Sequence, residues 1–473
     1  MSRLTLEDFG IDGGATVTGL SVDSRLVEPG HIFAALPGTA QDGRDYIPQA
    51  VAAGAVAVIS TADADTLGLP LLGSDNPRLA YAKAARVIHP RQPEVVVAVT
   101  GTNGKSSTVE FLRQIWQFAG HRSACFGTLG VRTKDALTPM SHTTPDAAAL
   151  HETLHRLAGQ GVTHAAMEAS SHGLDQHRMD AVDLAAAGFT NLSQDHFDYH
   201  SSVEEYHAAK ARLFTELLPA GRPTVIMTDD RGGRDMADLA RDAGLDVHKV
   251  GWAGRVLRIA EIMPHPASQM LTLVLNGKRE RVELPLAGEF QALNAVTALG
   301  LAMATGVDAQ TGLAALGHLS GVAGRLEMAG RKDNGAPIFV DFAHTEDGLV
   351  KLLNSVRPHV EGKLRIVFGC GGDRDPDKRP KMGAAATRFA DDVIVTDDNP
   401  RSEDPAAIRR AVLRGAPDAT EIGDRREAIA EGIARLEPGD CLVIAGKGHE
   451  TGQFVGDRVI PFNDVDVVRE LLA

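Results

Sequence analysis

Residues 95–107 read Val95-Val96-Val97-Ala98-Val99-Thr100-Gly101-Thr102-Asn103-Gly104-Lys105-Ser106-Ser107. The first five are all apolar, which is typical of a strand buried on both faces of a parallel sheet. A glycine-rich turn and a lysine follow, and the pattern from Ser106 to Ala119 predicts a helix. A strand, a glycine turn and a helix in this order predict a phosphate-binding loop in an α/β fold.

Each part of this loop has a chemical role. Backbone N–H groups at the start of a helix face a phosphate, Lys105 adds a positive charge, and the Ser106 hydroxyl suits Mg²⁺. The loop departs from the common pattern, because Val99 occupies the usual place of the first glycine. The alternative is a glycine turn that caps a helix carrying a surface lysine. The predicted ATP-binding residues of the loop are Gly101, Thr102, Asn103, Gly104, Lys105, Ser106 and Ser107.

The composition favours a globular protein and argues against a nucleic-acid-binding one. Of the 473 residues, 43% are hydrophobic and 23% charged, as in a globular protein of several domains. The 62 acidic and 48 basic side chains give a formal net charge of −14, which argues against a general nucleic-acid-binding protein. Local lysines and backbone amides still allow a phosphate site in an acidic chain.

We expect a cytoplasmic protein without a membrane span. No apolar run approaches the roughly 18 residues of a span, and residues 1–10 lack the apolar core of a signal peptide. Three cysteines, Cys125, Cys370 and Cys441, lie far apart and form no disulfide framework or zinc motif. We interpret them as free thiols.

Alternation of β-branched runs with Ala/Leu-rich stretches predicts three α/β blocks. A proline-bracketed segment at residues 89–93 separates the first block, 1–92, from the second, 93–321. A glycine-rich stretch then begins the third block, 322–473. Period-two runs around Asn276-Gly277 predict a small antiparallel subsheet within the second block. Two blocks are predicted to be doubly wound domains, which bind ligands at the carboxyl ends of their strands.

Polar clusters follow two later strands of the second block. The strand at 163–167 leads into Glu168, where such folds place a carboxylate on Mg²⁺ or on an attacking water. The next strand leads into a polar segment that contains His196; any one histidine there, taken alone, is more often structural. Lys210 lies on the predicted helix at 203–218, three and four residues after His207 and Tyr206 and therefore on one helical face with them. By physics alone it is an ordinary helix-surface lysine. Two clusters at successive strand ends predict a metal and substrate site.

Together these motifs resemble the Mur ligase family of bacterial cell-wall synthesis. The resemblance spans essentially the whole chain, in order, and is most specific to the members that extend a UDP-linked muramoyl dipeptide. Besides the phosphate loop and Lys210, it rests on residues 168–178, 191–200, 324–327, 341–345, 369–375 and 446–450.

The resemblance implies an ATP-dependent amide ligase of peptidoglycan precursor synthesis. The first block would bind UDP, the second would bind ATP, and the third, Rossmann-like block would receive an amino acid. ATP would phosphorylate the D-glutamyl γ-carboxylate of UDP-MurNAc-L-Ala-D-Glu, and the amine of meso-2,6-diaminopimelate would attack the acyl phosphate. The implied partners are these small molecules and no nucleic acid, and we expect a monomer.

The resemblance also assigns residues to roles. The implied catalytic set is Lys105, Glu168, His196 and Lys210, with Lys210 carbamylated by CO₂. The implied Mg²⁺ ligands are Ser106, Glu168, His196 and carbamylated Lys210. The further ATP contacts are Asn294, Arg325, Asp341 and His344. The contacts of the UDP-MurNAc-dipeptide are Ser24, Thr143, Thr144, Ser170, Gln176 and Arg178. The contacts of diaminopimelate are Arg374, Asp398, Asn399, Arg401, Gly446 and Glu450.

Three positions depart from the family pattern. Gln194 stands where relatives commonly have a basic residue, Phe342 where tyrosine is common, and Glu346 where proline is usual. None is an implied metal ligand, so these departures bear on fine positioning rather than on the type of reaction.

Relatives that add meso-diaminopimelate carry Asp-Asn-Pro-Arg in the third block, and lysine-adding relatives differ at the arginine. This resemblance implies that Asp398-Asn399-Pro400-Arg401 selects meso-diaminopimelate. The distal carboxylate of meso-diaminopimelate suits a bidentate contact with Arg401, while Asp398 and Glu450 balance its ammonium group. The same tetrapeptide occurs at Asp75-Asn76-Pro77-Arg78, where we expect a helix N-cap followed by proline in the first turn. Position and neighbours, rather than the four letters, therefore carry the specificity prediction.

Two kinds of alternative stay open. A ligase of the same architecture could add L-lysine or act as a folylpolyglutamate synthetase on a pterin substrate. A P-loop NTPase switch or motor would hydrolyse ATP without forming an amide. Phosphate release separates these classes, because a ligase needs both its acceptor and its amino acid.

Overall fold

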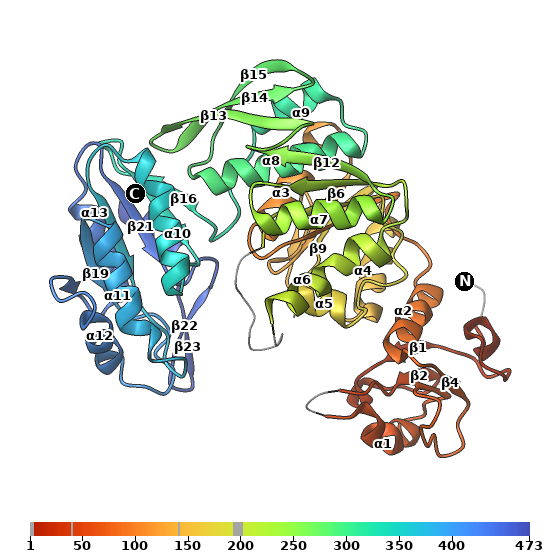
Figure 1. Cartoon of the computed structure of the whole chain (residues 1–473). Coiled ribbons are helices and arrows are strands. Elements are labelled where there is room, and N and C mark those ends of the chain that lie inside the picture. Colours follow the sequence, from red (N-terminus) through yellow and green to blue (C-terminus); the bar gives the residue numbers. More distant parts are fainter. Residues whose placement is uncertain (1–3, 39–40, 141, 193–201) are drawn as a thin grey trace. The chain divides into compact units, whose positions relative to one another are not determined.

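The computed structural model describes residues 4–38, 41–140, 142–192 and 202–473. The chain divides into two compact units, Met1–Arg258 with Val296–Gly312 and Ile259–Ala295 with Leu313–Ala473. Figure 1 shows the helices and strands of both.

The first unit begins with a parallel sheet in the order β1-β2-β3-β4. Its elements are β1 (Gly19–Ser21), β2 (His31–Ala34), α1 (Ile47–Ala52), β3 (Ala57–Ser60), β4 (Leu71–Gly73) and α2 (Pro77–Ile88). Proline is the first residue of α2, and Asn76 Oδ1 accepts a hydrogen bond from Leu79 N at 3.0 Å. The first copy of the repeated tetrapeptide is thus a helix cap, as predicted.

A second sheet of the first unit carries the phosphate loop. Its strand β5 (Val95–Thr100) lies between β9 (His164–Glu168) and β10 (Ala186–Phe189), and both are parallel to it. Residues 96–99 are fully buried, which confirms the predicted buried strand. The sheet continues through β11 (Pro223–Met227) and β12 (Asp246–Gly251) on one side, and β6 (Ser123–Gly127), β7 (Gly130–Arg132) and β8 (Leu137–Thr138) on the other. Its helices are α3 (Lys105–Phe118), α4 (Ala147–Gly159), α5 (Ser171–Asp175), α6 (Val203–Arg212) and α7 (Arg231–Asp242).

The predicted antiparallel hairpin is present. It consists of β14 (Ser268–Leu275) and β15 (Lys278–Leu284), paired antiparallel. Asn276 has φ +49° and Gly277 has φ +78°, as a two-residue type I′ turn requires. The division between the units passes through β13 (Leu257–His265), α8 (Glu289–Ala304) and α9 (Ala309–Leu316).

The second unit is doubly wound. Its sheet has the order β16-β17-β21-β18-β19-β20, in which only the edge strand β16 is antiparallel to its neighbour. Hydrophobic clusters cover both faces of this sheet. The strands are β16 (Glu327–Arg331), β17 (Pro337–Asp341), β18 (Leu364–Phe368), β19 (Asp392–Val395), β20 (Thr420–Glu421) and β21 (Cys441–Ala445). The helices are α10 (Glu346–Val356), α11 (Lys378–Phe389), α12 (Pro405–Leu413), α13 (Arg425–Ala434) and α14 (Asp464–Leu472). A separate hairpin pairs β22 (Gly452–Val455) with β23 (Arg458–Pro461).

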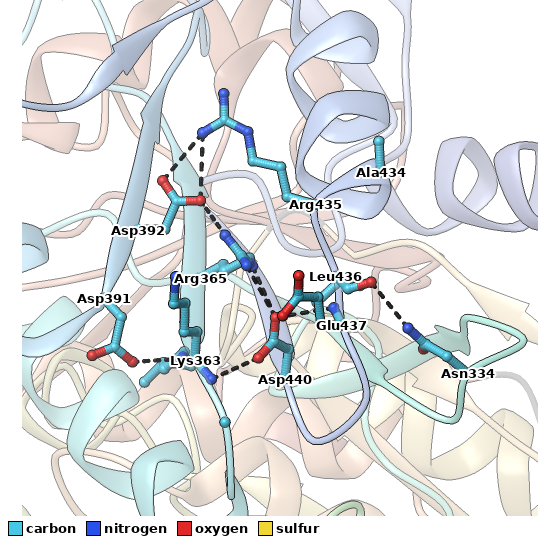
Figure 2. A network of polar contacts seen from close by, with 12 residues as sticks. Asn334, Lys363, Arg365, Asp391, Asp392, Ala434, Arg435, Leu436, Glu437 and Asp440 are labelled. Carbon is cyan, nitrogen blue, oxygen red and sulfur yellow. Dashed lines mark hydrogen bonds and ion pairs between the residues drawn. The ribbon is translucent and has the colours of Figure 1, made fainter.

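An ion-pair network joins the amino ends of β18, β19 and β21 (Figure 2). Arg365 contacts the carboxylate of Asp392 and donates to Asp440 Oδ2 at 3.0 Å, and Arg435 donates to Asp392 Oδ1 at 3.2 Å. Burial alone would raise the pKa of Asp440, but backbone N–H donors and Arg365 outweigh it and lower that pKa. This network fixes the strands at the ends remote from the loops that follow them.

Among the described residues, no helix is long and apolar enough to cross a membrane. The three cysteines are buried free thiols, as predicted.

The ion pair of Arg425 and Asp464 joins α13 to α14 with both side chains fully buried, at 2.7 Å and 2.8 Å. We expect Asp464→Asn to lower the free energy of unfolding by about 3 kcal/mol, because it leaves an uncompensated buried charge. Arg426 and Glu470 pair at 2.6 Å between the same helices, but both are about half exposed. Glu470→Gln should therefore cost less than about 1 kcal/mol. Urea denaturation of both variants is the measurement, and equal losses would contradict this account.

Candidate active site

The phosphate loop is fixed by the residues that follow β10. A Cβ atom on Gly101 would overlap Thr190 Oγ1, so glycine is required at this close approach. Thr102 N donates to Asn191 O at 2.8 Å, and Asn103 N donates to Asn191 Oδ1 at 3.1 Å. The loop therefore presents a rigid backbone at the start of α3, which is the arrangement that binds phosphate.

Two lysine ammonium groups converge on one carbonyl group of this loop. Lys105 Nζ donates to Gly101 O and Thr102 O, both at 2.9 Å. Lys210 Nζ donates to the same Gly101 O at 3.0 Å. Two positive groups this close stabilise an anion bound beside them, and they repel each other in its absence.

The interpretation of Lys210 as a helix-surface lysine is wrong. Its side chain is 1% exposed, and its Nζ lies 4.1 Å from the centre of the Tyr206 ring. α6 ends at Arg212, and the π-helical turn Leu213–Leu217 replaces the last part of the single predicted helix. Helical spacing correctly placed Tyr206 and Lys210 on one face, but it does not reveal what covers that face.

Glu168 lies at the end of β9, opposite Val99 in the register with β5. Its carboxylate is buried and accepts hydrogen bonds from Thr128 N at 2.9 Å and Thr128 Oγ1 at 3.3 Å. A Cβ on Gly127 would overlap this carboxylate, so the absence of a side chain there makes room for it. The acid therefore lies on the strand next to the phosphate loop, as predicted.

The donor set fits Mg²⁺, which prefers oxygen ligands. The Ser106 hydroxyl lies in the first turn of α3, and the Glu168 carboxylate lies at the end of the neighbouring strand. An ammonium group at Lys210 has no lone pair for a cation, whereas a carbamate offers oxygen atoms. Within the described ranges, no cluster of three or more His, Cys, Asp and Glu side chains suits a metal. The implied ligand His196 and the departure Gln194 lie outside the described residues.

Four of the residues assigned to the muramoyl dipeptide form one hydrogen-bonded cluster beside Glu168. Thr144 Oγ1 donates to Glu168 O at 3.0 Å, and Ser170 Oγ donates to Thr144 Oγ1 at 3.0 Å. Arg178 donates to Thr144 O and to Gln176 Oε1, both at 2.7 Å. These polar side chains thus share one neighbourhood with the implied metal ligand.

The other two residues of that assignment lie differently. The hydroxyl of Thr143 is 3.0 Å from the hydroxyl of Thr128. Because Thr128 donates hydrogen bonds to Glu168, Thr143 adjoins the same cluster. Ser24 belongs to the region of the four-stranded sheet, where its Oγ donates to Gln49 Oε1 at 2.9 Å.

The residues predicted as further ATP contacts lie in the second unit: Asn294, Arg325, Asp341 and His344. Asn294 is buried on α8. Asp341 ends β17 and accepts hydrogen bonds from Leu326 N at 2.7 Å and Ala343 N at 2.8 Å. Burial raises the pKa of Asp341 in spite of these donors. The Asp341 carboxylate thus fixes the backbone directly after Arg325 and the backbone directly before His344.

Phe342, which stands where relatives commonly have tyrosine, contacts Arg325 and His344. The Arg325 guanidinium lies 5.3 Å from the centre of its ring, and the ring centre of His344 lies 4.7 Å away. An aromatic face is thus kept at this position although the hydroxyl of tyrosine is absent. Glu346, which stands where relatives usually have proline, is the first residue of α10. An acidic side chain at this position stabilises the N-terminus of the helix.

The residues assigned to diaminopimelate follow the strands β18, β19 and β21. Arg401 has φ +51° and donates from Nη1 to Gly372 O at 2.7 Å. Asp398 is buried, and burial raises the pKa of its carboxyl group. A Cβ on Gly446 would lie 2.5 Å from Asp398 Oδ2, so this glycine leaves room for the acid. Arg374 lies on the loop after β18 and donates to Asp373 O at 3.4 Å.

Sequence reasoning missed Lys447. This lysine is fully buried, and its Nζ lies 3.0 Å from the Glu450 carboxylate. Asn399 also donates to Glu450 Oε2, at 2.8 Å. Glu450 therefore already has a buried cationic partner. The sequence signals were the position of Lys447 between two glycines and its place in the family-like stretch 446–450, which assigned roles to Gly446 and Glu450 but none to the lysine.

The structure thus divides the predicted site by unit. The phosphate loop, Glu168, Lys210 and the dipeptide residues belong to the first unit, and the further nucleotide and diaminopimelate residues belong to the second. In both units, loops that carry predicted site residues follow parallel strands, where doubly wound sheets bind ligands.

Comparisons with known proteins match three family models along the chain. These are the Mur ligase family, catalytic domain over residues 16–100, the Mur ligase middle domain over 99–302, and the Mur ligase, glutamate ligase domain over 324–448. The UDP-N-acetylmuramoyl-L-alanyl-D-glutamate--2,6-diaminopimelate ligase of Agrobacterium fabrum is 51% identical, over 98% of this chain and 94% of its own length. The protein of the same name from Bradyrhizobium diazoefficiens is 52% identical, over 97% and 95%.

A solved structure of a protein with that name has a TM-score of 0.77 and 35% sequence identity, and the match covers 99% of both chains. Family models, relatives and fold agree over nearly the full length. The chain therefore belongs to the Mur ligase family.

Proposed function

We propose that the protein is an ATP-dependent ligase that joins meso-2,6-diaminopimelate to UDP-MurNAc-L-Ala-D-Glu in peptidoglycan precursor synthesis. The observation that carries this proposal is the convergence of Lys105 and Lys210 on the phosphate loop, with Glu168 at the end of the neighbouring strand. The names of relatives that are 51% and 52% identical support the choice of substrates.

The chemistry requires activation of a carboxylate. A carboxylate is a poor electrophile, so its oxygen is first converted to a phosphate leaving group by transfer of the γ-phosphoryl group of ATP, which releases ADP. The amine then attacks the acyl carbon, the C–O bond to phosphate breaks, and an amide and inorganic phosphate form. Bringing the anionic triphosphate to the anionic acceptor requires local positive charge, which Lys105 supplies.

The residues of this chain orient the two reactants. The backbone of the phosphate loop holds the triphosphate at the start of α3. The cluster of Thr144, Ser170 and Arg178 holds the dipeptide end of the acceptor beside Glu168, to which Thr144 donates a hydrogen bond. Holding both reactants in one neighbourhood lowers the entropic part of the barrier.

Ser106, Glu168, His196 and a carbamate on Lys210 are the residues that would hold Mg²⁺. The bound ion would neutralise charge on the phosphoryl oxygen atoms. Carbamylation forms an N–C bond between the uncharged amine of a lysine and CO₂, with loss of a proton. Lys210 Nζ is buried and lies within hydrogen-bond distance of the same carbonyl oxygen as Lys105 Nζ, so a carbamate there would adjoin the positive charge of Lys105. The modification would turn the Lys210 cation into an oxygen donor.

The three blocks then have separate roles: 1–92 for UDP, 93–321 for ATP and 322–473 for the amino acid. We place the reaction in the cytoplasm, where ATP is made, and we propose that the protein is a monomer. Size-exclusion chromatography with light scattering tests the oligomeric state.

A substitution of Lys105 tests the assignment of the phosphate loop. Lys105→Glu puts a negative charge beside the triphosphate, so we expect ATP binding and phosphate release to fall below detection in titration calorimetry and coupled assays. Lys83→Glu makes the same charge change at an exposed position of α2 and should leave both unchanged. Unaltered nucleotide affinity in Lys105→Glu would remove the phosphate-loop assignment.

Lysine 210 is tested with labelled CO₂. We expect a carbamate carbon signal in the ¹³C NMR spectrum of the enzyme equilibrated with ¹³CO₂, and its loss in Lys210→Arg. Lys332→Met, which removes another lysine with several carbonyl partners, should retain the signal. A signal that persists in Lys210→Arg would show that the carbamate is elsewhere.

Selectivity tests the role of Arg401. Arg401→Ala should lower kcat/KM for meso-diaminopimelate by about 100-fold, because a bidentate charged contact is lost, and should reduce the preference over L-lysine. Arg78→Ala changes the arginine of the identical tetrapeptide, which donates to Pro37 O at 2.9 Å, and should leave selectivity unchanged. Equal use of L-lysine and meso-diaminopimelate by the wild-type enzyme would contradict the assignment.

A further inference from the structure

We propose that Lys447 and the hairpin β22–β23 position residues 398–401, which we call the specificity loop. On this proposal, they set the affinity of Arg401 for the distal carboxylate of the incoming diamino acid. The inference rests on the proposed function, and it adds a positioning residue and an element that the assigned site does not include.

Lys447 is held by three acceptors in the interior of the second unit. Its side chain is fully buried, and Nζ donates to Gly452 O at 2.6 Å, Glu450 Oε2 at 3.0 Å and Asn399 Oδ1 at 3.2 Å. Three acceptors match the three N–H donors of an ammonium group, and a buried charge persists only with such partners. Because these acceptors belong to the specificity loop, to Glu450 and to the first residue of β22, one ammonium group ties all three together.

The hairpin also pairs with the specificity loop through the backbone. Arg401 N donates to Phe454 O at 2.9 Å, and Gly456 N donates to Arg401 O at 2.7 Å, in a parallel bridge. Gln453 Nε2 donates to Asp398 O at 2.6 Å. The hairpin therefore forms hydrogen bonds with both ends of the specificity loop.

Arg401 needs this support. Its φ of +51° is a left-handed conformation that a non-glycine residue adopts only when its surroundings impose it. The backbone conformation determines where the side chain begins, and the guanidinium then reaches Gly372 O. Weakening the hydrogen bonds between the hairpin and the specificity loop would let the backbone of Arg401 leave its left-handed conformation. The guanidinium of Arg401 would then be misplaced, while the phosphate loop and Glu168 stay unchanged.

The chain offers a matched control for Lys447. Lys332 Nζ also donates to three acceptors in the second unit, at 2.9 Å, 2.9 Å and 3.0 Å, but these are the carbonyl oxygens of Ile433, Ala434 and Leu436. They belong to the segment that precedes the amino end of β21 and do not touch the specificity loop. Loss of this lysine tests stability without the proposed positioning role.

The first experiment compares Lys447→Met with Lys332→Met in the full-length enzyme. We expect KM for meso-diaminopimelate to rise about tenfold in Lys447→Met, with kcat and the KM values for ATP and the UDP-linked acceptor within about twofold. The preference over L-lysine should fall as well. Lys332→Met should keep all of these constants. An unchanged KM for meso-diaminopimelate in a folded Lys447→Met enzyme would overturn the proposal, as would equal changes for all three substrates.

A second pair of variants acts on the backbone alone. Gly456 has φ +56° in the turn of β22–β23, and a Cβ there meets no atom within 4 Å, so Gly456→Val strains only the turn. We expect the same selective rise in KM. Gly335 has φ +89°, equally open surroundings and a turn position between β16 and β17, so Gly335→Val is the control. If Lys447→Met fails to fold, unchanged kinetics in Gly456→Val overturn the proposal.

Hydrogen exchange separates this inference from the proposed function. The amide protons of Arg401 and Gly456 should exchange at least tenfold faster in Lys447→Met and Gly456→Val than in the wild type, while those of β18 keep their rates. Unchanged exchange at both amides would overturn the positioning role. A wild-type enzyme that forms no amide with meso-diaminopimelate would overturn the proposed function, whereas the exchange measurement would still decide the positioning role.

Discussion

The site depends on the parallel pairing of β5 with β9 and β10. This pairing places the phosphate loop, Glu168 and Asn191 at one edge of one sheet, because parallel strands end at the same side. Asn191 then fixes the backbone of the loop, and Lys105 and Lys210 meet at its Gly101 carbonyl. Without this strand order, the lysines at the phosphate loop and the Glu168 carboxylate, which the proposed chemistry uses, would not lie at one edge of the sheet.

The second unit follows the same physical principle, and its proposed ligand is the incoming diamino acid. Its strands are held at their amino ends by the network of Arg365, Asp392 and Asp440, so the loops at their carboxyl ends are left for binding. Arg401 lies there in a strained conformation held by a hairpin and a buried lysine. In the proposed site, an acidic protein thus places positive groups where its anionic substrates would bind. Its net charge argues against a general nucleic-acid-binding protein without excluding phosphate.

Local signals predicted much of the fold. The buried run of β5, the Asn276-Gly277 turn and the cap at Asn76 each follow from the conformational preferences of their own residues. The burial of Lys210 and Lys447 did not, because it depends on what distant segments place over them. Helical spacing placed Lys210 beside Tyr206 but assigned it to the surface. The role proposed for Lys210 came only from the family resemblance. Lys447 lies in the matching stretch 446–450, but the resemblance assigned no role to it.

The most direct test of the central claim is phosphate release with defined combinations of substrates, with the product analysed by mass spectrometry. With ATP and Mg²⁺, the account predicts sustained phosphate release only when UDP-MurNAc-L-Ala-D-Glu and meso-diaminopimelate are both present. One amide should form for each phosphate released. Steady phosphate release without the acceptor or the amino acid, and without an amide product, would contradict the ligase and favour an NTPase switch.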